Sequence, residues 1–234
     1  MKKPLYSGKT KSIFEHEPGL YLMEFRNDIT AGDGVKHEVM ENKGYYSSEI
    51  SAKLFEVLNA SGVKTHFVKK LGDSRFLVRS LKMCPVEFVC RNIAAGHLVK
   101  SYYMFKDGQK LDRPILQMFL KDDERHDPLI NESTVLSAGL LKKERIKEME
   151  DMTLKVNDVL KKVFDNAGIT LVDFKLEFGF DENGAVRVGD EISPDSMRLW
   201  DKKTSKILDK DVFRKDLGDV MSVYEEVAKR IGAV

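Results

Sequence analysis

A predicted β-hairpin in the C-terminal third of the chain limits the fold most strongly. Residues 171–180 and 185–192 each alternate between apolar and polar side chains, and Asp-Glu-Asn-Gly at 181–184 separates them. Asn-Gly between two alternating runs is a strong hairpin signal, because both residues tolerate the left-handed backbone of tight turns. The chain is therefore predicted to contain an antiparallel sheet that includes this hairpin.

The two faces of the first strand differ in character. Its central residues run in the order Asp173, Phe174, Lys175, Leu176, Glu177, Phe178. Because successive side chains of a strand point to opposite faces, one face is apolar and the other carries acid, base and acid. Burying such a charged face costs free energy unless a ligand binds there. The alternative is a solvated face with a Lys–Asp pair across the hairpin.

The second strand provides another carboxylate. If the hairpin closes symmetrically about residues 182–183, Glu177 lies opposite Val188. Lys175 then lies opposite Asp190, which makes Glu177 a diagonal neighbour of Asp190 on one face. Both carboxylates can then reach one cation. Because further charges follow directly after the strand, the sequence favours a metal–phosphate site here.

The overall charge balance argues against nucleic acid or a membrane as a partner. The 234 residues include 39 Lys and Arg against 38 Asp and Glu, a net charge of +1, so the chain has no strong global field. No apolar run approaches the roughly 20 residues of a membrane span, and the first residues lack an apolar signal segment. We therefore expect a cytoplasmic protein. Cys84 and Cys90 fit no zinc-binding spacing, which predicts two buried free thiols.

The first 83 residues are predicted to form an antiparallel-sheet domain with one helix. The expected strands are residues 12–16, 20–25, 66–70 and 76–81, and the expected helix is residues 45–60. Met83-Cys84-Pro85 interrupts this pattern and predicts a domain boundary, with a second domain at residues 84–234.

A glycine turn precedes the first of these strands. Gly8-Lys9-Thr10 has the ending of a Walker A loop, but that loop needs glycine where Lys3 stands and a helix afterwards, whereas a strand follows here. The turn, with Lys9 and Lys11, either covers nucleotide phosphates or is a solvated basic turn.

The second domain contains two features whose role stays open. Glu87 and Arg91 share one face of a predicted strand at 86–93, either as a structural ion pair or as part of a binding site. The loop at 122–129 holds four acids with an arginine and a histidine, and it is either functional or a flexible solvated loop. Amphipathic core helices are expected at residues 141–163 and 220–231.

Six segments together resemble one known enzyme family. They are YSGKTKSI, EFRND-x-x-AGDG, VEFVCRNIAAG, HDPLINES, LVDFKLEFG and GDEISPDSMRLWD, in order between about Leu5 and Ile231. In these segments the chain is similar to phosphoribosylaminoimidazole-succinocarboxamide synthase (SAICAR synthetase). The resemblance implies an α+β fold, with a kinase-lobe-like N-terminal sheet domain, a larger α/β C-terminal domain and ATP in the cleft between them. It also implies ligation of the carboxylate of carboxyaminoimidazole ribonucleotide to the amine of L-aspartate, with ATP split to ADP and phosphate.

The resemblance also assigns roles to individual residues. It places Mg²⁺ on Glu177 and Asp190, ATP phosphates near Gly8, Lys9 and Lys11, adenine beside Met83, and the nucleotide near Lys121 and Lys175. It places the ribonucleotide and aspartate near Arg91, His97, Asp127, Asp195, Arg198 and Arg214. Lys175, Asp195 and Arg198 are the expected catalytic residues. His97 stands where the family usually has serine, so a hydrogen bond from its ring to the ribonucleotide phosphate and simple packing against Tyr102 or Tyr103 are both open.

Two other functional classes remain as alternatives. A kinase-like phosphotransferase would share the lysines and the metal acids but would transfer phosphate to a hydroxyl group, and the chain lacks the His-Arg-Asp and Asp-Phe-Gly elements of protein kinases. A regulatory nucleotide-binding module would not need an intact pair of metal acids. A homodimer is neither predicted nor excluded by the sequence.

Overall fold

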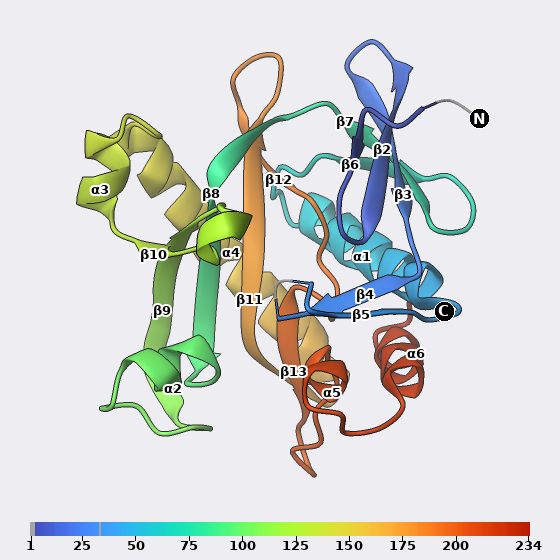
Figure 1. Ribbon diagram of the computed structural model, residues 1–234, viewed down its shortest axis with the longest axis vertical. Helices are drawn as coiled ribbons and strands as arrows, with labels where there is room; N and C mark the ends of the chain where they lie inside the picture. The colour runs from blue at the N-terminus through green and yellow to red at the C-terminus, as the bar shows by residue number, and fades with distance from the viewer. Residues whose placement is uncertain (1–2, 33) are drawn as a thin grey trace.

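The computed structural model of the protein describes residues 3–32 and 34–234 and shows an α+β fold (Figure 1). Its strands form two antiparallel sheets and a two-stranded ribbon. The first sheet has the order β1-β2-β3-β7-β6. Its strands are β1 (Tyr6–Ser7), β2 (Lys11–Glu17), β3 (Leu20–Phe25), β6 (Phe67–Lys70) and β7 (Arg75–Arg79). The four strands predicted in the N-terminal region are therefore confirmed, and the glycine turn joins β1 to β2.

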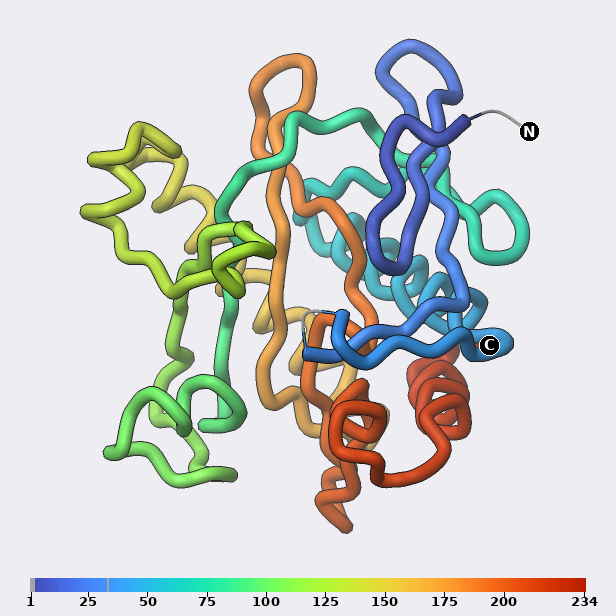
Figure 2. The backbone as a smooth tube through the Cα atoms, in the orientation of Figure 1, coloured from blue at the N-terminus to red at the C-terminus, as the bar shows by residue number. Residues whose placement is uncertain are grey.

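Helix α1 (Lys43–Ala60) packs against this first sheet. Its apolar residues recur at the helical period, and Ile50, Leu54 and Phe55 are fully buried. In the chain, β4 (Asp28–Ala31) and β5 (Lys36–Val39) follow β3 and form the ribbon before α1 begins. The ribbon crosses toward the C-terminal helices (Figure 2), where Lys36 Nζ donates to the carbonyl oxygen of Phe213 at 2.7 Å.

The second sheet has the order β10-β9-β8-β11-β12, with β13 also paired to β11. Its strands are β8 (Lys82–Ile93), β9 (Lys110–Leu120), β10 (Leu129–Ile130), β11 (Ile169–Phe180), β12 (Val186–Gly189) and β13 (Met197–Asp201). The amphipathic helix α4 (Lys143–Asn166) lies behind β11 in the view of Figure 1, as its apolar stripe predicts. The charged side chains of β11 therefore lie on the face of this sheet that α4 does not cover.

The remaining helices are short. They are α2 (His97–Ser101), the 3-10 turn η1 (Asp123–Arg125), α3 (Glu132–Ser137), α5 (Asp211–Arg214) and α6 (Val220–Arg230). Among them, α6 packs against α1 and α3 against α4. Helix α6 confirms the predicted closing helix. Among the described residues, no helix combines the length and apolarity needed to cross a membrane.

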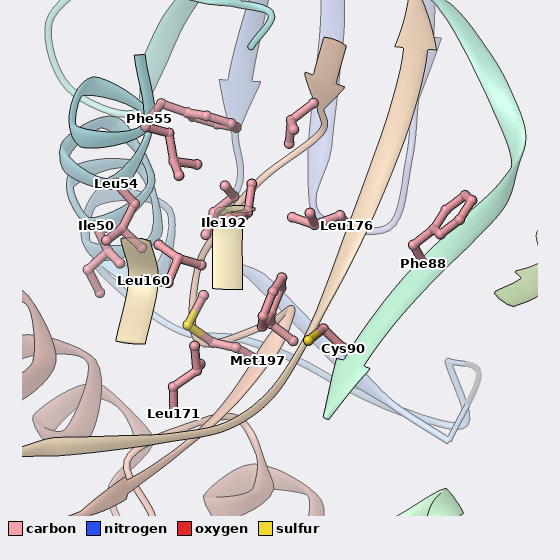
Figure 3. Close-up of a cluster of buried hydrophobic side chains, with 14 of the residues drawn as sticks. Ile50, Leu54, Phe55, Phe88, Cys90, Leu160, Leu171, Leu176, Ile192 and Met197 are labelled. Carbon is pink, nitrogen blue, oxygen red and sulfur yellow. The ribbon is translucent and has the colours of Figure 1, made fainter. Parts of the chain in front are cut away.

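One apolar core contains residues of both sheets and of the helices packed on them. Figure 3 shows Phe55 of α1, Leu160 of α4 and Leu176 of β11 in one cluster with Phe88 and Cys90 of β8. Cys84 and Cys90 are both buried and free, as predicted. The chain passes from the first sheet to the second just before residue 82, and β8 continues through Cys84-Pro85 without a break. The division into domains at residues 1–83 and 84–234 remains a prediction.

The predicted register of the hairpin was wrong by one residue. Glu177 lies opposite Gly189, not Val188, and Lys175 has no partner in β12, because that strand ends at Gly189 before Asp190. The reason is the loop, which holds three residues between Asp181 and Ala185 and ends in Gly184 with φ of 73°. A three-residue loop with glycine in the left-handed region shifts the pairing by one residue relative to a two-residue turn.

Candidate active site

The charged side chains of β11 pair with charged side chains of the neighbouring strand β8. Asp173 lies opposite Arg91, and Glu177 lies opposite Glu87. Arg91 Nη1 donates to Asp173 at 2.7 Å, while Lys175 Nζ lies 2.9 Å from Glu87 and 3.0 Å from Glu177. Glu87 and Arg91 therefore do not pair with each other; each pairs with a charge on β11. Because the acids of this face are buried, the solvated alternative for the strand is wrong.

Lysines surround the two proposed metal ligands. Lys121, at the end of β9, pairs with Glu177, and Lys11 Nζ lies 2.6 Å from both Asp190 and Glu191. Burial alone would raise the pKa of Glu177, but the charges of Lys175 and Lys121 outweigh it and lower the pKa to about 2. This carboxylate is therefore ionised at neutral pH, as a metal ligand must be.

Asp190 reaches the same region by a different geometry from the one predicted. It follows the last residue of β12 and has φ of 56°, an uncommon value for a non-glycine residue. The backbone thus turns out of the strand at Asp190, and the carboxylate meets Lys11. The buried ring of His66 interacts with the backbone of Asp190 at this turn.

The donor set fits a magnesium ion that arrives with a nucleotide. The described residues contain no group of three or more His, Cys, Asp or Glu side chains that could hold an ion by themselves. Mg²⁺ is commonly bound by one or two carboxylates while phosphate oxygens and waters complete its octahedron. Glu177 and Asp190, next to the lysines, meet that requirement.

The glycine turn closes over this region from the first sheet. Arg26 Nη2 donates to the carbonyl oxygens of Gly8 and Lys9, at 2.7 and 2.8 Å, and so fixes the shape of the turn. Lys9 Nζ lies 2.8 Å from Asp123 in the acidic loop. The loop is itself closed by Asp127, whose Oδ1 accepts from the backbone N of Asp122 at 2.7 Å. The acidic loop thus faces the glycine turn, and it is not merely a free solvated segment.

Met83 lies where the two sheets meet. Its side chain is 40% exposed, and a Cβ on Gly189 would lie 3.3 Å from Met83 Cε. The absence of a side chain at residue 189 therefore leaves room for Met83 beside the turn that carries Asp190. Met83 is close to the proposed metal ligands but does not line the cavity described next.

A cavity of about 420 Å³ opens next to this cluster, on the other side of Lys175. Its charged lining residues are Lys9, Arg91, Asp173, Lys175, Asp195, Arg198, Lys210 and Arg214. Six predicted site residues (Lys9, Arg91, Lys175, Asp195, Arg198 and Arg214) are therefore brought together in one cavity. Gly8, Lys11, Met83, His97, Lys121, Asp127, Glu177 and Asp190 do not line it.

Two aspartates orient the three arginines of the cavity. Asp173 accepts from Arg91 at 2.7 Å and from Arg198 at 2.8 Å. Asp211 accepts from Arg198 at 3.2 Å and from Arg214 at 2.7 Å. Burial alone would raise the pKa of Asp211, but Arg198 and Arg214 lower it to about 2. The guanidinium groups are thus held in place before any ligand binds, an arrangement suited to phosphate and carboxylate recognition.

Gly96 allows the closest of these contacts. Its φ of 56° lies in the left-handed region, and a Cβ at this position would fall 2.5 Å from Arg198 Nη2. Any other residue would push the guanidinium aside. Glycine at this position therefore helps to set where Arg198 lies in the cavity.

His97 lies beside the cavity rather than in its lining. Its ring packs edge-on against Phe119, with centroids 5.7 Å apart, and lies 3.2 Å from Ser101 Oγ. Packing against Tyr102 or Tyr103 was therefore wrong, because the helix α2 turns the ring toward β9. Burial and the nearby charge of Arg91 lower the pKa of His97.

Asp195 belongs to a buried network that sequence reasoning did not find. Both of its oxygens are engaged: one pairs with Lys43 of α1, and the other accepts from Tyr224 of α6 at 2.5 Å. Burial alone would raise the pKa of Asp195, but Lys43 and Lys210 lower it well below its usual range. Lys43 comes from a segment 152 residues away, and no local pattern marks it. Asp173 and Glu87, by contrast, stand out in the sequence as charges on strands.

Comparison with known proteins agrees with this geometry. The sequence profile described as SAICAR synthetase matches residues 4–231. Phosphoribosylaminoimidazole-succinocarboxamide synthase of Methanocaldococcus jannaschii is 52% identical over 231 residues, which cover 99% of this chain and 95% of that protein. The enzyme of the same name from Pseudomonas fluorescens is 48% identical over 232 residues, covering 99% and 98%.

Solved structures agree as well. A SAICAR synthetase in complex with ADP has a TM-score of 0.94 to this structure at 43% identity, covering 97% of this chain and 96% of that one. The phosphoribosylaminoimidazole-succinocarboxamide synthase of Ehrlichia chaffeensis has a TM-score of 0.96 at 39% identity, covering 99% of both chains. The chain belongs to the SAICAR synthetase family.

Proposed function

We infer that the protein catalyses the ATP-dependent formation of SAICAR in purine biosynthesis. The reaction joins the carboxylate of carboxyaminoimidazole ribonucleotide to the amine of L-aspartate and yields ADP and phosphate. The names of its relatives and the ADP complex of a close structural neighbour support this function. Each of the three substrates is a small molecule with phosphate or carboxylate groups, which the lysines and arginines of the site suit.

The chemistry requires activation of a carboxylate. A carboxylate does not react with an amine until one of its oxygens becomes part of a good leaving group, and transfer of the ATP γ-phosphoryl group to that oxygen achieves this. Phosphoryl transfer depends mainly on positioning and charge neutralisation. We assign the metal to Glu177 and Asp190, where it would neutralise phosphate charge, and the remaining neutralisation to Lys9, Lys11, Lys121 and Lys175.

The position of Lys175 is the observation that best supports a phosphoryl-transfer site here. Its Nζ contacts the proposed metal ligand Glu177, and its side chain also lines the arginine cavity. Lys175 therefore lies between the proposed nucleotide site at Glu177 and the proposed substrate site in the arginine cavity. The phosphoryl group must pass from the first of these sites to the second. We propose that ATP binds between the two sheets, with its base near Met83 and the glycine turn over its phosphates.

The arginine cavity is the proposed site of the other two substrates. Arg91, Arg198 and Arg214 are preoriented donors, and guanidinium groups bind phosphate and carboxylate bidentately. Asp127 and His97 lie outside the lining, so we propose that they act at its edge. Asp195 holds the cationic side chains around it in place.

Substrate omission tests this function. With ATP, Mg²⁺, the ribonucleotide and aspartate, free phosphate and the succinocarboxamide should appear in equal amounts, and omission of any one substrate should stop both. Phosphorylated product without free phosphate would identify a kinase-like phosphotransferase instead. Nucleotide binding without turnover would identify a regulatory module.

A further inference from the structure

Lys210 is the cavity lysine that the mechanism above does not use. It immediately precedes α5, lines the arginine cavity and is 9% exposed. Among the contacts of the described residues, its Nζ has neither a hydrogen bond nor an ion pair, whereas Lys9 and Lys175 in the same cavity both pair with acids. Lys210 is thus a largely buried lysine whose amine faces the cavity without a protein acceptor in the described part of the chain, and partial burial of this kind favours the neutral amine over the ammonium group.

Burial favours the same form, while the charges around Lys210 act in both directions. The groups that face it are Asp195 and Glu191 on the segment before β13, Lys43 of α1 and Arg214 of α5. Burial lowers the pKa of Lys210, the two carboxylates oppose this, and Arg214 and Lys43 lower it further. Both oxygens of Asp195 are already taken by Lys43 and Tyr224, so this carboxylate does not offer Lys210 a close partner.

The ligation step needs a proton acceptor. The α-amine of aspartate is an ammonium group at neutral pH and has no lone pair with which to attack a carbonyl carbon. The cavity acids are unsuitable acceptors, because Asp173 is held by Arg91 and Arg198, and Asp195 by its own network. Lysines with a pKa lowered by burial and neighbouring cations act as general bases in enzymes.

We propose that Lys210 is the general base that deprotonates the α-ammonium group of aspartate. This rests on the proposed function. One N–H proton passes to the neutral Nζ of Lys210. The freed lone pair then forms the C–N bond to the acyl carbon, while the C–O bond to phosphate breaks and its electrons leave with phosphate. The second amine proton leaves on that phosphate, and Lys210 returns its proton to solvent after product release.

A nucleophile that is already unprotonated can distinguish a role of Lys210 as a base from a role in substrate binding. Hydroxylamine is largely unprotonated at neutral pH and converts an acyl phosphate to a hydroxamate. Lys210→Arg keeps a long basic side chain, with the charge that Lys210 carries after it accepts the proton, but a guanidinium group cannot itself accept a proton. We expect its aspartate ligation to fall by about 100-fold or more, while hydroxamate formation from ATP, the ribonucleotide and hydroxylamine stays within about threefold of the parent. Lys202→Arg, an exposed lysine paired with Asp165, is the matched control and should change neither rate.

The outcomes separate the two proposals. Failure of the parent protein to make the succinocarboxamide would overturn the proposed function itself. If the parent makes it, and Lys210→Arg either keeps aspartate ligation or loses both reactions equally, only the assignment of Lys210 is overturned.

A second variant tests the titration directly. Lys210→Cys, alkylated with 2-bromoethylamine, restores an amine of lower pKa at the same position. Cys84 and Cys90 are buried and burial raises the pKa of both thiols, that of Cys90 to about 12, so they react slowly. The acidic limb of the kcat profile should move to lower pH than in the parent. An unmoved limb would contradict a base at Lys210.

Discussion

Glu87 and Glu177 lie directly opposite each other on β8 and β11, and Lys175 Nζ lies between them, 2.9 Å from one carboxylate and 3.0 Å from the other. Two buried acids facing each other repel, and burial already raises the pKa of Glu87. The ammonium group therefore stabilises the strand pair as well as the site.

The role of Lys175 in stability can be measured with a double-mutant cycle. Lys175→Met should lower the free energy of unfolding by about 1–3 kcal/mol, because it removes the ion-pair partner of the buried Glu87 and leaves Glu177 with Lys121 alone. Adding Glu87→Gln should recover part of this loss, since the repulsion is then gone. Urea unfolding at neutral pH gives all four values. Additive effects of the two changes would show that Lys175 does not act by bridging these acids.

The metal ligands are tested by removing one charge at a time. Glu177→Gln and Asp190→Asn should each reduce kcat by orders of magnitude and weaken the response to Mg²⁺, because each removes one of two anionic ligands. Glu182→Gln, in the exposed hairpin loop, is the matched control. Rate as a function of Mg²⁺ concentration is the measurement. Near-parental kcat and Mg²⁺ response in either variant would contradict the assignment.

The two lysines of the glycine turn should behave differently from each other. Lys9 is half exposed, so Lys9→Ala should raise KM for ATP with little effect on stability. The side chain of Lys11 is only 13% exposed and pairs with Asp190 and Glu191, so Lys11→Ala should raise KM for ATP and also destabilise the fold. KM for the ribonucleotide should change little in both, with Lys69→Ala as the control. Unchanged ATP kinetics in both variants would mean that the turn is only a basic surface loop.

His97 should titrate in response to the ribonucleotide. Burial and the charge of Arg91 lower its pKa in the free protein, and a bound phosphate dianion should raise it. If the ring donates to that phosphate, KM for the ribonucleotide rises as pH climbs through the pKa of the complex, because the charged donor is lost. NMR titration of the ring with and without ligand, and KM against pH, measure both effects.

Two variants complete the test of His97. His97→Ser should flatten the pH dependence near neutral pH and still support turnover, since a hydroxyl donor does not titrate there. A His97→Ala variant whose KM matches the parent at every pH would show that the ring only packs against Phe119.

The fold was predictable from the sequence wherever the evidence was local. The alternation of residues 171–180 predicts β11, and the helical stripe at 141–163 predicts α4, because each element buries one face. The register of the hairpin was not predictable from the Asn-Gly signal, because two-residue and three-residue loops both use glycine at the end of the turn. That single residue decides whether Glu177 faces Val188 or Gly189.

The site was predictable only in part, for a related physical reason. The charged face of β11 signals a site by itself, and the family resemblance supplies the arginines. Lys43 and Tyr224 reach Asp195 from α1 and α6, and Glu87 reaches Glu177 through a strand pairing that no turn specifies. Such contacts follow from tertiary packing, which one sequence does not display.

The central claim is that ATP activates the carboxylate of the ribonucleotide by phosphorylation. Measuring whether a carboxylate oxygen appears in the released phosphate tests it most directly. The ribonucleotide would be labelled with ¹⁸O in its carboxylate and converted with ATP, Mg²⁺ and aspartate, and the released phosphate analysed by mass spectrometry. Activation by phosphoryl transfer predicts one ¹⁸O atom in each phosphate released, because the C–O bond breaks when the amine attacks. Phosphate without ¹⁸O, formed together with the succinocarboxamide, would contradict activation of the carboxylate at this site.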